Sequence, residues 1–124
     1  MPLRGIRGAT TVESNTREAI LDACREMLSE LIRRNDIETE DVASAYFSTT
    51  PDLNAEFPAV AARNDFGWHY AALMCGHEMY VPGSLQMCLR VTVMVNTETA
   101  QKDVQHVFLR GAAALRPDLA PPSK

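Results

Sequence analysis

Apolar residues recur along residues 19–32 with the spacing of one face of an α-helix. These positions are Ala19, Ile20, Ala23, Cys24, Met27, Leu28, Leu31 and Ile32. The spacing predicts an amphipathic helix with one buried face. Asn15 or Thr16 can cap its N-terminus, and Asn35 is suited to end it after about Arg34.

A different pattern, alternation with a period of two, runs through residues 86–95, QMCLRVTVMV. In a strand it places Cys88, Arg90, Thr92 and Met94 on one face and Leu89, Val91, Val93 and Val95 on the other. Arg90 is then a charge within an apolar strand. A guanidinium keeps its charge and is rarely buried alone. Arg90 therefore needs an anionic partner on the face that it shares with Cys88.

Further strands are predicted over residues 3–12, 42–50 and 69–75, and a short helix over 59–68. Residues 104–115 fit either a strand or a helix. Within the first strand, Gly5 and Gly8 flank Arg7, and strand glycines mark bulges or close approaches.

These elements predict the α+β class, a mixed β-sheet of about five strands with one long amphipathic helix on one face. A sheet with strands this apolar needs cover on both faces. One long helix cannot provide it, so we expect the chain to associate with copies of itself.

The chain has 124 residues, which predicts a single domain over residues 1–116 and a Pro-rich, mobile tail over 117–124. A net charge of -4 argues against nucleic acid or an anionic membrane as partner. No apolar run approaches the ~20 residues of a membrane span, and the N-terminus lacks a signal-peptide core. We expect a cytoplasmic protein whose cysteines, Cys24, Cys75 and Cys88, are reduced.

Several kinds of chemistry find little support in the sequence. Cys75, His77, Glu78 and Cys88 are close in sequence but lack the paired spacing of zinc ligands. A Cys/His nucleophile rests on residue types alone, and both glycine-rich phosphate motifs are absent. No metal site is therefore predicted.

What remains is a set of arginines near the ends of elements, with Glu78 in a loop. The arginines are Arg7, Arg63, Arg90 and Arg116. Arginines on strands suit a small di-acid and could stabilise charge that develops during a reaction. Scattered surface charges are the alternative.

Five segments carry a family resemblance: RGIRGATTVE (4–13), TPDLNAEFPA (50–59), ARNDFGW (62–68), CGHEMYVPGSLQMCLRV (75–91) and LRPDL (115–119). Together they resemble the monofunctional, trimeric chorismate mutases of the pseudo-α/β-barrel class. The resemblance implies conversion of chorismate to prephenate by an intramolecular Claisen rearrangement, in Phe and Tyr biosynthesis. It also implies a homotrimer with active sites between subunits, and no cofactor or metal.

Carried over by position, the resemblance implies that Arg90 binds the ether oxygen and a neighbouring carboxylate, Arg7 a substrate carboxylate, and Glu78 the substrate hydroxyl. The implied substrate-binding residues are Phe57, Ala59, Arg63, Leu73, Met74, Cys75, Cys88, Phe108, Leu115 and Arg116. Cys75 would contribute its backbone, and Arg116 would become ordered over the site with substrate.

Two positions depart from the family pattern. Phe108 stands where the motif H-x-Y-L has a tyrosine whose hydroxyl touches a substrate carboxylate, and Val60 stands where lysine is frequent. Loss of one hydrogen bond, about 1 kcal/mol, should weaken binding without abolishing activity. Two other functions remain open from the residues: a trimeric imine/enamine deaminase and a non-catalytic binder of small carboxylates.

Overall fold

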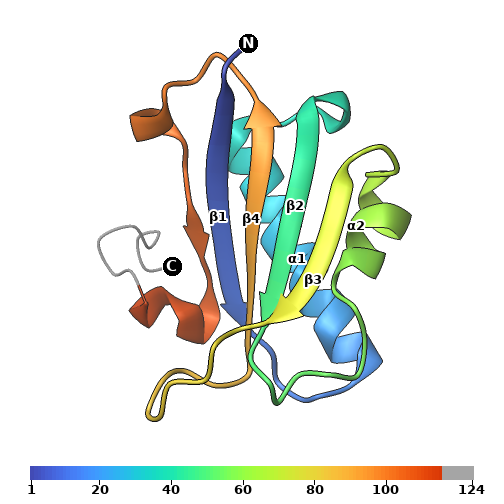
Figure 1. Cartoon of the computed structure of the whole chain (residues 1–124), viewed down its shortest axis with the longest axis vertical. Helices are drawn as coiled ribbons and strands as arrows, with labels where there is room; N and C mark the ends of the chain where they lie inside the picture. Colours follow the sequence, from blue (N-terminus) through green and yellow to red (C-terminus); the bar gives the residue numbers. More distant parts are fainter. Residues whose placement is uncertain (116–124) are drawn as a thin grey trace.

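A mixed sheet of five strands forms the centre of the chain, in the order β3-β2-β4-β1-β5 (Figure 1). The computed structural model describes residues 1–115. The strands are β1 (Leu3–Thr11), β2 (Val42–Thr49), β3 (Ala72–His77), β4 (Cys88–Asn96) and β5 (Val107–Phe108). Strand β4 is antiparallel to both β1 and β2, whereas β3 pairs parallel to β2 and β5 parallel to β1. The mixed sheet predicted from the sequence is confirmed.

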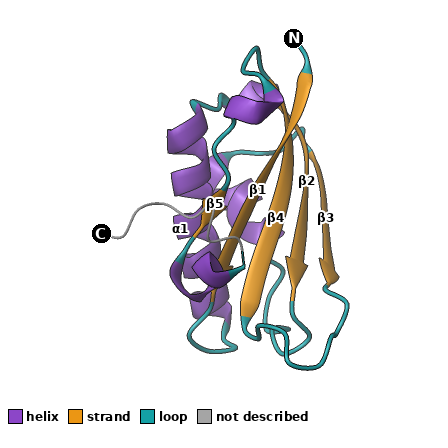
Figure 2. Cartoon of the chain, turned by 90° about the vertical axis from the view of Figure 1, so that its left-hand side faces the viewer, coloured by secondary structure: helices purple, strands orange, loops and turns teal. Residues whose placement is uncertain are grey.

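Helices α1 (Arg17–Asn35) and α2 (Ala59–Phe66) lie on one side of this sheet, and among residues 1–115 the other side carries no α-helix (Figure 2). Thr16 is the N-cap of α1, because its hydroxyl accepts the Ala19 N–H at 3.1 Å. The helix ends at Asn35, and Asp36 takes the left-handed conformation that terminates it. The predicted long helix on one face is therefore confirmed.

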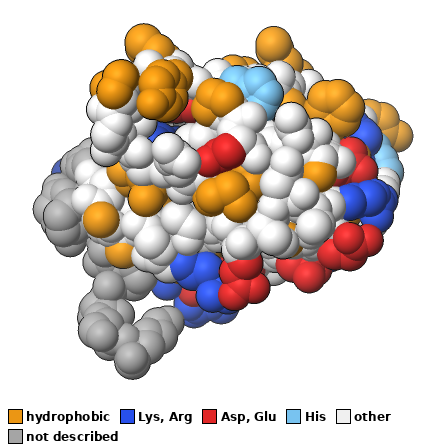
Figure 3. All heavy atoms as spheres, turned by 90° about the horizontal axis from the view of Figure 1, so that it is seen from below, with side chains coloured by type: hydrophobic (Ala, Val, Ile, Leu, Met, Phe, Trp, Pro, Cys, Tyr) orange, Lys and Arg blue, Asp and Glu red, His pale blue; other side chains and the backbone are white. Residues whose placement is uncertain are grey.

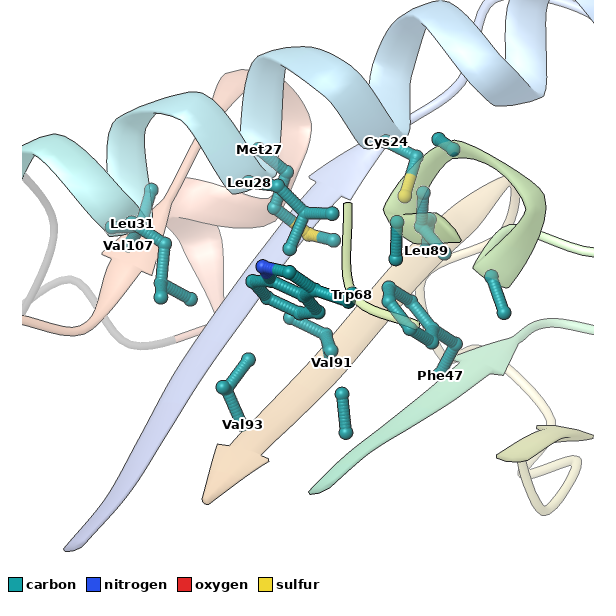
Figure 4. Packing of buried hydrophobic residues seen from close by; sticks show 14 of the residues in the cluster. Cys24, Met27, Leu28, Leu31, Phe47, Trp68, Leu89, Val91, Val93 and Val107 are labelled. Carbon is teal, nitrogen blue, oxygen red and sulfur yellow. The ribbon is translucent and has the colours of Figure 1, made fainter. Parts of the chain in front are cut away.

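The main core lies between α1 and the sheet (Figure 4). The buried side chains of α1 are Ile20, Leu21, Cys24, Met27, Leu28 and Leu31. Strand β4 faces them with Leu89, Val91, Val93 and Val95, the alternate set expected from its sequence. Trp68 and Phe47 fill the space between helix and sheet. Arg90 is thereby turned to the opposite face.

Gly8 marks a close approach of α1 to the sheet rather than a bulge. A Cβ atom on Gly8 would lie 3.1 Å from Met27 Cγ and 3.2 Å from both Leu31 Cδ1 and Val91 Cγ1. Every residue of β1 pairs in unbroken register with β4. The helix can pack this closely because residue 8 has no side chain.

The third strand begins later than predicted, at Ala72 rather than in the segment 69–71. Gly67, with φ 71°, ends α2, and the Trp68 N–H donates to Ala62 O at 3.1 Å. Trp68 is buried in the core, so the chain must first turn back before it can join the sheet edge. The turn depends on the burial of Trp68 in the core, and the pattern of apolar residues along the sequence does not predict that burial.

The segment 104–115 contains both of the structures that its pattern allowed. Strand β5 has only two residues and is followed by a 3₁₀ helix, η3 (Arg110–Ala114). The Leu109 N–H donates to Ala9 O at 2.9 Å, which extends the pairing with β1. Arg110 then has φ 51°, and this left-handed residue turns the chain out of the sheet.

The bare face of the sheet combines polar and apolar side chains. Strand register and alternation place Ala9, Arg90, Ser48 and Gly76 in one row, and Arg7, Thr92, Tyr46 and Met74 in the next. Tyr46 and Met74 are exposed there. Within residues 1–115, neither α1 nor any other helix combines the length and apolar content of a membrane span.

Candidate active site

A hollow of about 310 Å³ opens on the bare face and contains all three predicted catalytic residues. Arg7 comes from β1, Arg90 from β4, and Glu78 follows the last residue of β3. Among the described residues, its lining is Arg7, Tyr46, Ser48, His77, Glu78, Arg90, Val91 and Thr92. The strand order β3-β2-β4-β1 thus brings two arginines and a carboxylate together from distant parts of the chain.

Arg90 is held by Glu78 but keeps donors for a ligand. Arg90 Nη1 lies 3.3 Å from Glu78 Oε2, and the side chains are 21% and 37% exposed. Arg90 Nε is buried and has no hydrogen-bond partner among residues 1–115. A guanidinium offers five N–H donors, and a buried donor without an acceptor is costly. The arrangement is suited to an anion placed against Arg90.

Glu78 is oriented by its own backbone and its neighbours. Its N–H donates to Thr49 O at 2.8 Å, which continues the pairing of β3 with β2. Its Oε1 accepts the Met79 N–H at 2.8 Å. One carboxylate oxygen is therefore engaged with the loop, and the other faces Arg90.

Arg7 is supported from the β5 side of the sheet. Its backbone N–H donates to His106 Nδ1 at 2.9 Å, so this ring nitrogen carries no proton. Its guanidinium carbon lies 5.7 Å from the centroid of the Phe108 ring, within the range of a cation–π contact. Phe108 thus positions the Arg7 charge.

Cys88 and Phe108, both predicted to bind substrate, are buried in a small cluster with Ala9 and Ala112. Leu115 packs against the same cluster. Burial raises the pKa of the Cys88 thiol, and the Arg90 guanidinium opposes that rise. In the single chain Cys88 and Phe108 are thus buried beneath Arg90 and Arg7 and do not line the hollow themselves.

A second hollow, of about 320 Å³, contains other predicted residues. Its lining is Thr49, Leu53, Asn54, Ala55, Glu56, Phe57, Pro58, Cys75, Gly76 and His77. Phe57 is 67% exposed. Burial raises the pKa of the Cys75 thiol, while the Ala59 backbone N–H and the Arg63 charge act against the rise. His77, at the end of β3, lines both hollows.

The remaining predicted residues within 1–115 line neither of these hollows. Leu73 packs partly buried against the core, whereas Met74 is exposed on the bare face, because neighbours in a strand point oppositely. Arg63 is exposed in the last turn of α2. Val60 packs partly buried against the core. Arg116 and the predicted tail lie outside the described residues.

The loop that carries Phe57 is tied to the start of α1. Asn15 Oδ1 accepts the N–H groups of Asn54 and Ala55, both at 3.0 Å. Glu56 pairs with Arg17 at 2.8 Å. The Phe57 N–H, Arg17 and Arg63 together lower the pKa of the Glu56 carboxyl. The position of Phe57 therefore depends on the N-terminus of α1.

Sequence reasoning missed four polar or aromatic residues of the first hollow, namely Tyr46, Ser48, His77 and Thr92. Thr92 shares the face of Arg90 by alternation, which was the one available signal. Tyr46 and Ser48 lie opposite Thr92 and Arg90 only because β2 pairs with β4.

The fold and the first hollow define a small α+β protein with an arginine-lined site for an anionic ligand. A family model described as chorismate mutase type I matches residues 3–119. Chorismate mutase AroH of Bacillus subtilis (strain 168) is 46% identical over 120 residues, covering 97% of this chain and 94% of that protein. Chorismate mutase AroH of Thermus thermophilus is 48% identical over 118 residues, covering 94% and 96% respectively.

A solved structure agrees with these relatives. The chorismate mutase from Clostridium thermocellum has a TM-score of 0.86 and 47% identity, covering 89% of this chain and 97% of that chain. The present chain therefore belongs to the type I chorismate mutase family. This membership assigns to the chain the activity of a chorismate mutase, an isomerase of aromatic amino acid biosynthesis. The resemblance stated from the sequence motifs is confirmed.

Proposed function

We propose that this chain converts chorismate to prephenate by an intramolecular Claisen rearrangement, with Arg90, Arg7 and Glu78 as its catalytic residues. The observation that carries this assignment is the state of Arg90. Its Nε is buried without a hydrogen-bond acceptor among residues 1–115, in a hollow that also contains Arg7 and Glu78.

The reaction breaks one C–O bond and forms one C–C bond within a single molecule, so no nucleophile and no proton transfer are needed. The enzyme must hold chorismate in a compact conformer and stabilise the negative charge that grows on the ether oxygen. Arg90 can donate to that oxygen and to the adjacent carboxylate. Because its strand is packed against the core, the donor is already in place before the charge develops.

Arg7 and Glu78 then orient the two ends of the substrate. Arg7 binds a carboxylate, and its contact with the Phe108 ring fixes the direction of the guanidinium. Glu78 accepts a hydrogen bond from the substrate hydroxyl while its other oxygen remains with the Met79 N–H. Holding both ends keeps the reacting carbons close together.

The protein acts as a homotrimer with each active site between adjacent subunits. The separation of the predicted residues into two hollows supports this, because Arg90 lies in one and Phe57 in the other. The Phe57 hollow of one subunit would complete the Arg90 hollow of the next. Phe57, Ala59, Arg63, Leu73, Met74 and Cys75 would come from one subunit, and Cys88, Phe108, Leu115 and Arg116 from the other.

Exposed apolar side chains supply a surface for this assembly. Met79, Tyr80 and Val81 are exposed in the loop between β3 and β4. Viewed from that end of the molecule, apolar side chains gather along the upper edge of Figure 3, and acidic and basic side chains along the lower edge. With Tyr46 and Met74 of the bare face, this loop would become buried between subunits.

The enzyme is cytoplasmic, forms a single domain over residues 1–116, and uses neither a metal nor an organic cofactor. Its ligands are chorismate and prephenate, and it binds neither nucleic acid nor membranes. The net charge of -4 supports the last point.

Loss of chorismate absorbance at catalytic protein concentration tests the function directly. Arg90→Ala should lower turnover by two to three orders of magnitude, on the scale of removing a preorganised donor. Arg90→Lys should also be poor, because an ammonium cannot make the two-pronged contact. Arg33→Ala, which removes an exposed arginine of α1, is the matched control and should leave turnover unchanged.

Two outcomes would contradict the proposal. Wild-type protein that does not accelerate the spontaneous reaction would contradict the activity itself. Near-normal turnover of a folded Arg90→Ala oligomer would remove Arg90 from the mechanism. Trimer mass by light scattering should be the same for wild type and both Arg90 variants.

A further inference from the structure

Tyr46 lies in the same hollow as the proposed catalytic residues, although nothing in the sequence singled it out. It is on β2, its side chain is 45% exposed, and it lines the hollow together with Arg7, Glu78 and Arg90. Its Cα partner on β4 is Thr92. Tyr46 therefore belongs to the row of Arg7 and Thr92, which lies beside the row of Arg90.

The Tyr46 ring leans out of its own row towards Gly76. A Cβ atom on Gly76 would overlap Tyr46 Oη and would lie 3.3 Å from Cζ. Gly76 pairs with Ser48, and Ser48 pairs with Arg90. The hydroxyl is thereby brought into the row of Arg90, close to the end of β3 that leads into Glu78. The missing side chain of Gly76 provides the space.

The Tyr46 hydroxyl makes no hydrogen bond with any residue of the described chain. A phenolic O–H can make a hydrogen bond while its ring packs against the protein. Here the ring lies over Gly76, and the O–H is available as a donor at the hollow. Phe108, beside Arg7, has no hydroxyl to offer.

We propose that Tyr46 is a substrate-binding residue, whose hydroxyl donates a hydrogen bond to a carboxylate of the dicarboxylate held by Arg7 and Arg90. A neutral donor aimed at a carboxylate forms a charge-assisted bond. It adds direction without adding a further charge to the hollow. This inference rests on the proposed function of the hollow, and it assigns a ligand contact to a residue outside the predicted set.

Tyr46→Phe removes the hydroxyl and keeps the ring. It should raise KM for chorismate about five- to tenfold, the range expected for one hydrogen bond to a charged group, with kcat changed by less than about twofold. Binding of prephenate, measured by titration calorimetry, should weaken by the same factor. Tyr70→Phe is the matched control, because Tyr70 is fully exposed and outside the hollow, and should change neither value.

Gly76→Ala tests the geometry separately. The added methyl group would occupy the place of the hydroxyl and displace it, so KM should rise as in Tyr46→Phe. In the double variant KM should be close to that of either single variant, because the two substitutions remove the same contact. Additive effects in the double variant would contradict the proposed position of the hydroxyl.

The outcomes separate this inference from the proposed function. A wild-type protein without chorismate mutase activity would overturn the function itself. Normal activity of the wild type with an unchanged KM and prephenate affinity in Tyr46→Phe would overturn only the role of Tyr46. Dissociation of the Tyr46→Phe oligomer would also overturn it, because the hydroxyl would then serve a subunit contact.

Discussion

The Asp52 carboxylate accepts the backbone N–H of Met87, with the nitrogen 3.0 Å from Oδ2 and 3.3 Å from Oδ1. Met87 has φ 51°, a left-handed conformation that is uncommon for a residue with a side chain. The Thr50 hydroxyl donates to Asp52 Oδ1 at 2.5 Å and accepts the Cys88 N–H at 3.0 Å. These bonds hold the turn through which the chain enters β4, just before Arg90.

Asp52→Ala should therefore affect both stability and catalysis. We expect the free energy of unfolding to fall by about 1 to 3 kcal/mol, because the Met87 and Thr50 donors lose their acceptor. Turnover should fall because Arg90 shifts. Asp52→Asn should lie between the wild type and Asp52→Ala in both measurements, since its side chain keeps one oxygen acceptor. Denaturant unfolding and initial rates measure the two effects. Asp103→Ala, at an exposed position, is the control, and equal behaviour of both alanine variants would contradict the role.

Phe108→Tyr should lower KM for chorismate about fivefold, which corresponds to one added hydrogen bond. The expected position of the hydroxyl follows from the family motif H-x-Y-L, and the ring already lies beside the Arg7 guanidinium. Steady-state kinetics would measure the gain. A less stable protein with unchanged KM would mean that the new hydroxyl is buried without a partner, because Phe108 is almost completely enclosed.

Gly8→Ala should lower the free energy of unfolding by roughly 1 to 3 kcal/mol, because the added methyl group would press on Met27 and Leu31 of α1. Gly5→Ala, on the bare face of the same strand, is the natural comparison. Its methyl group would lie 3.5 Å from the Met94 sulfur, an ordinary contact, so its effect should stay below about 1 kcal/mol. Equal losses in the two variants would contradict the close approach of α1 at Gly8.

Stability should depend on Glu30 at acid pH. The hydrogen bond from Arg33, followed by that from Arg34, lowers the pKa of Glu30 from 4.5 to about 2. A pKa lowered by folding contributes stability above the unfolded value near 4.5, and this contribution is lost as the pH falls towards 2. Glu30→Gln should thus have a lower free energy of unfolding than the wild type at pH 7, and the difference should disappear near pH 2.

Urea unfolding across this pH range would measure the Glu30 effect. It should be small and shrink in high salt, because Arg33 is largely exposed to solvent. Glu98→Gln, at an exposed position without an ion pair among the described residues, is the control and should follow the wild type. A Glu30→Gln deficit that is independent of pH would contradict the ion pair as its source.

Local patterns in the sequence were sufficient for the elements whose structure depends on neighbours along the chain. The 3.6-residue spacing predicted α1, and alternation predicted which side chains of β4 face the core and that Arg90 does not. Motifs spread over residues 4–119 were sufficient to identify the family. Each of these signals is carried by the order of residues itself.

Only the tertiary structure decided which distant residues meet. The strand order places Arg7, Glu78 and Arg90 around one hollow, and the pairing of β2 with β3 and β4 brings Tyr46 over Gly76 and into the same hollow. The start of β3 likewise depends on burial of Trp68. Such contacts join residues far apart in sequence and result from packing and strand pairing of the whole sheet, so no periodicity within a segment can report them.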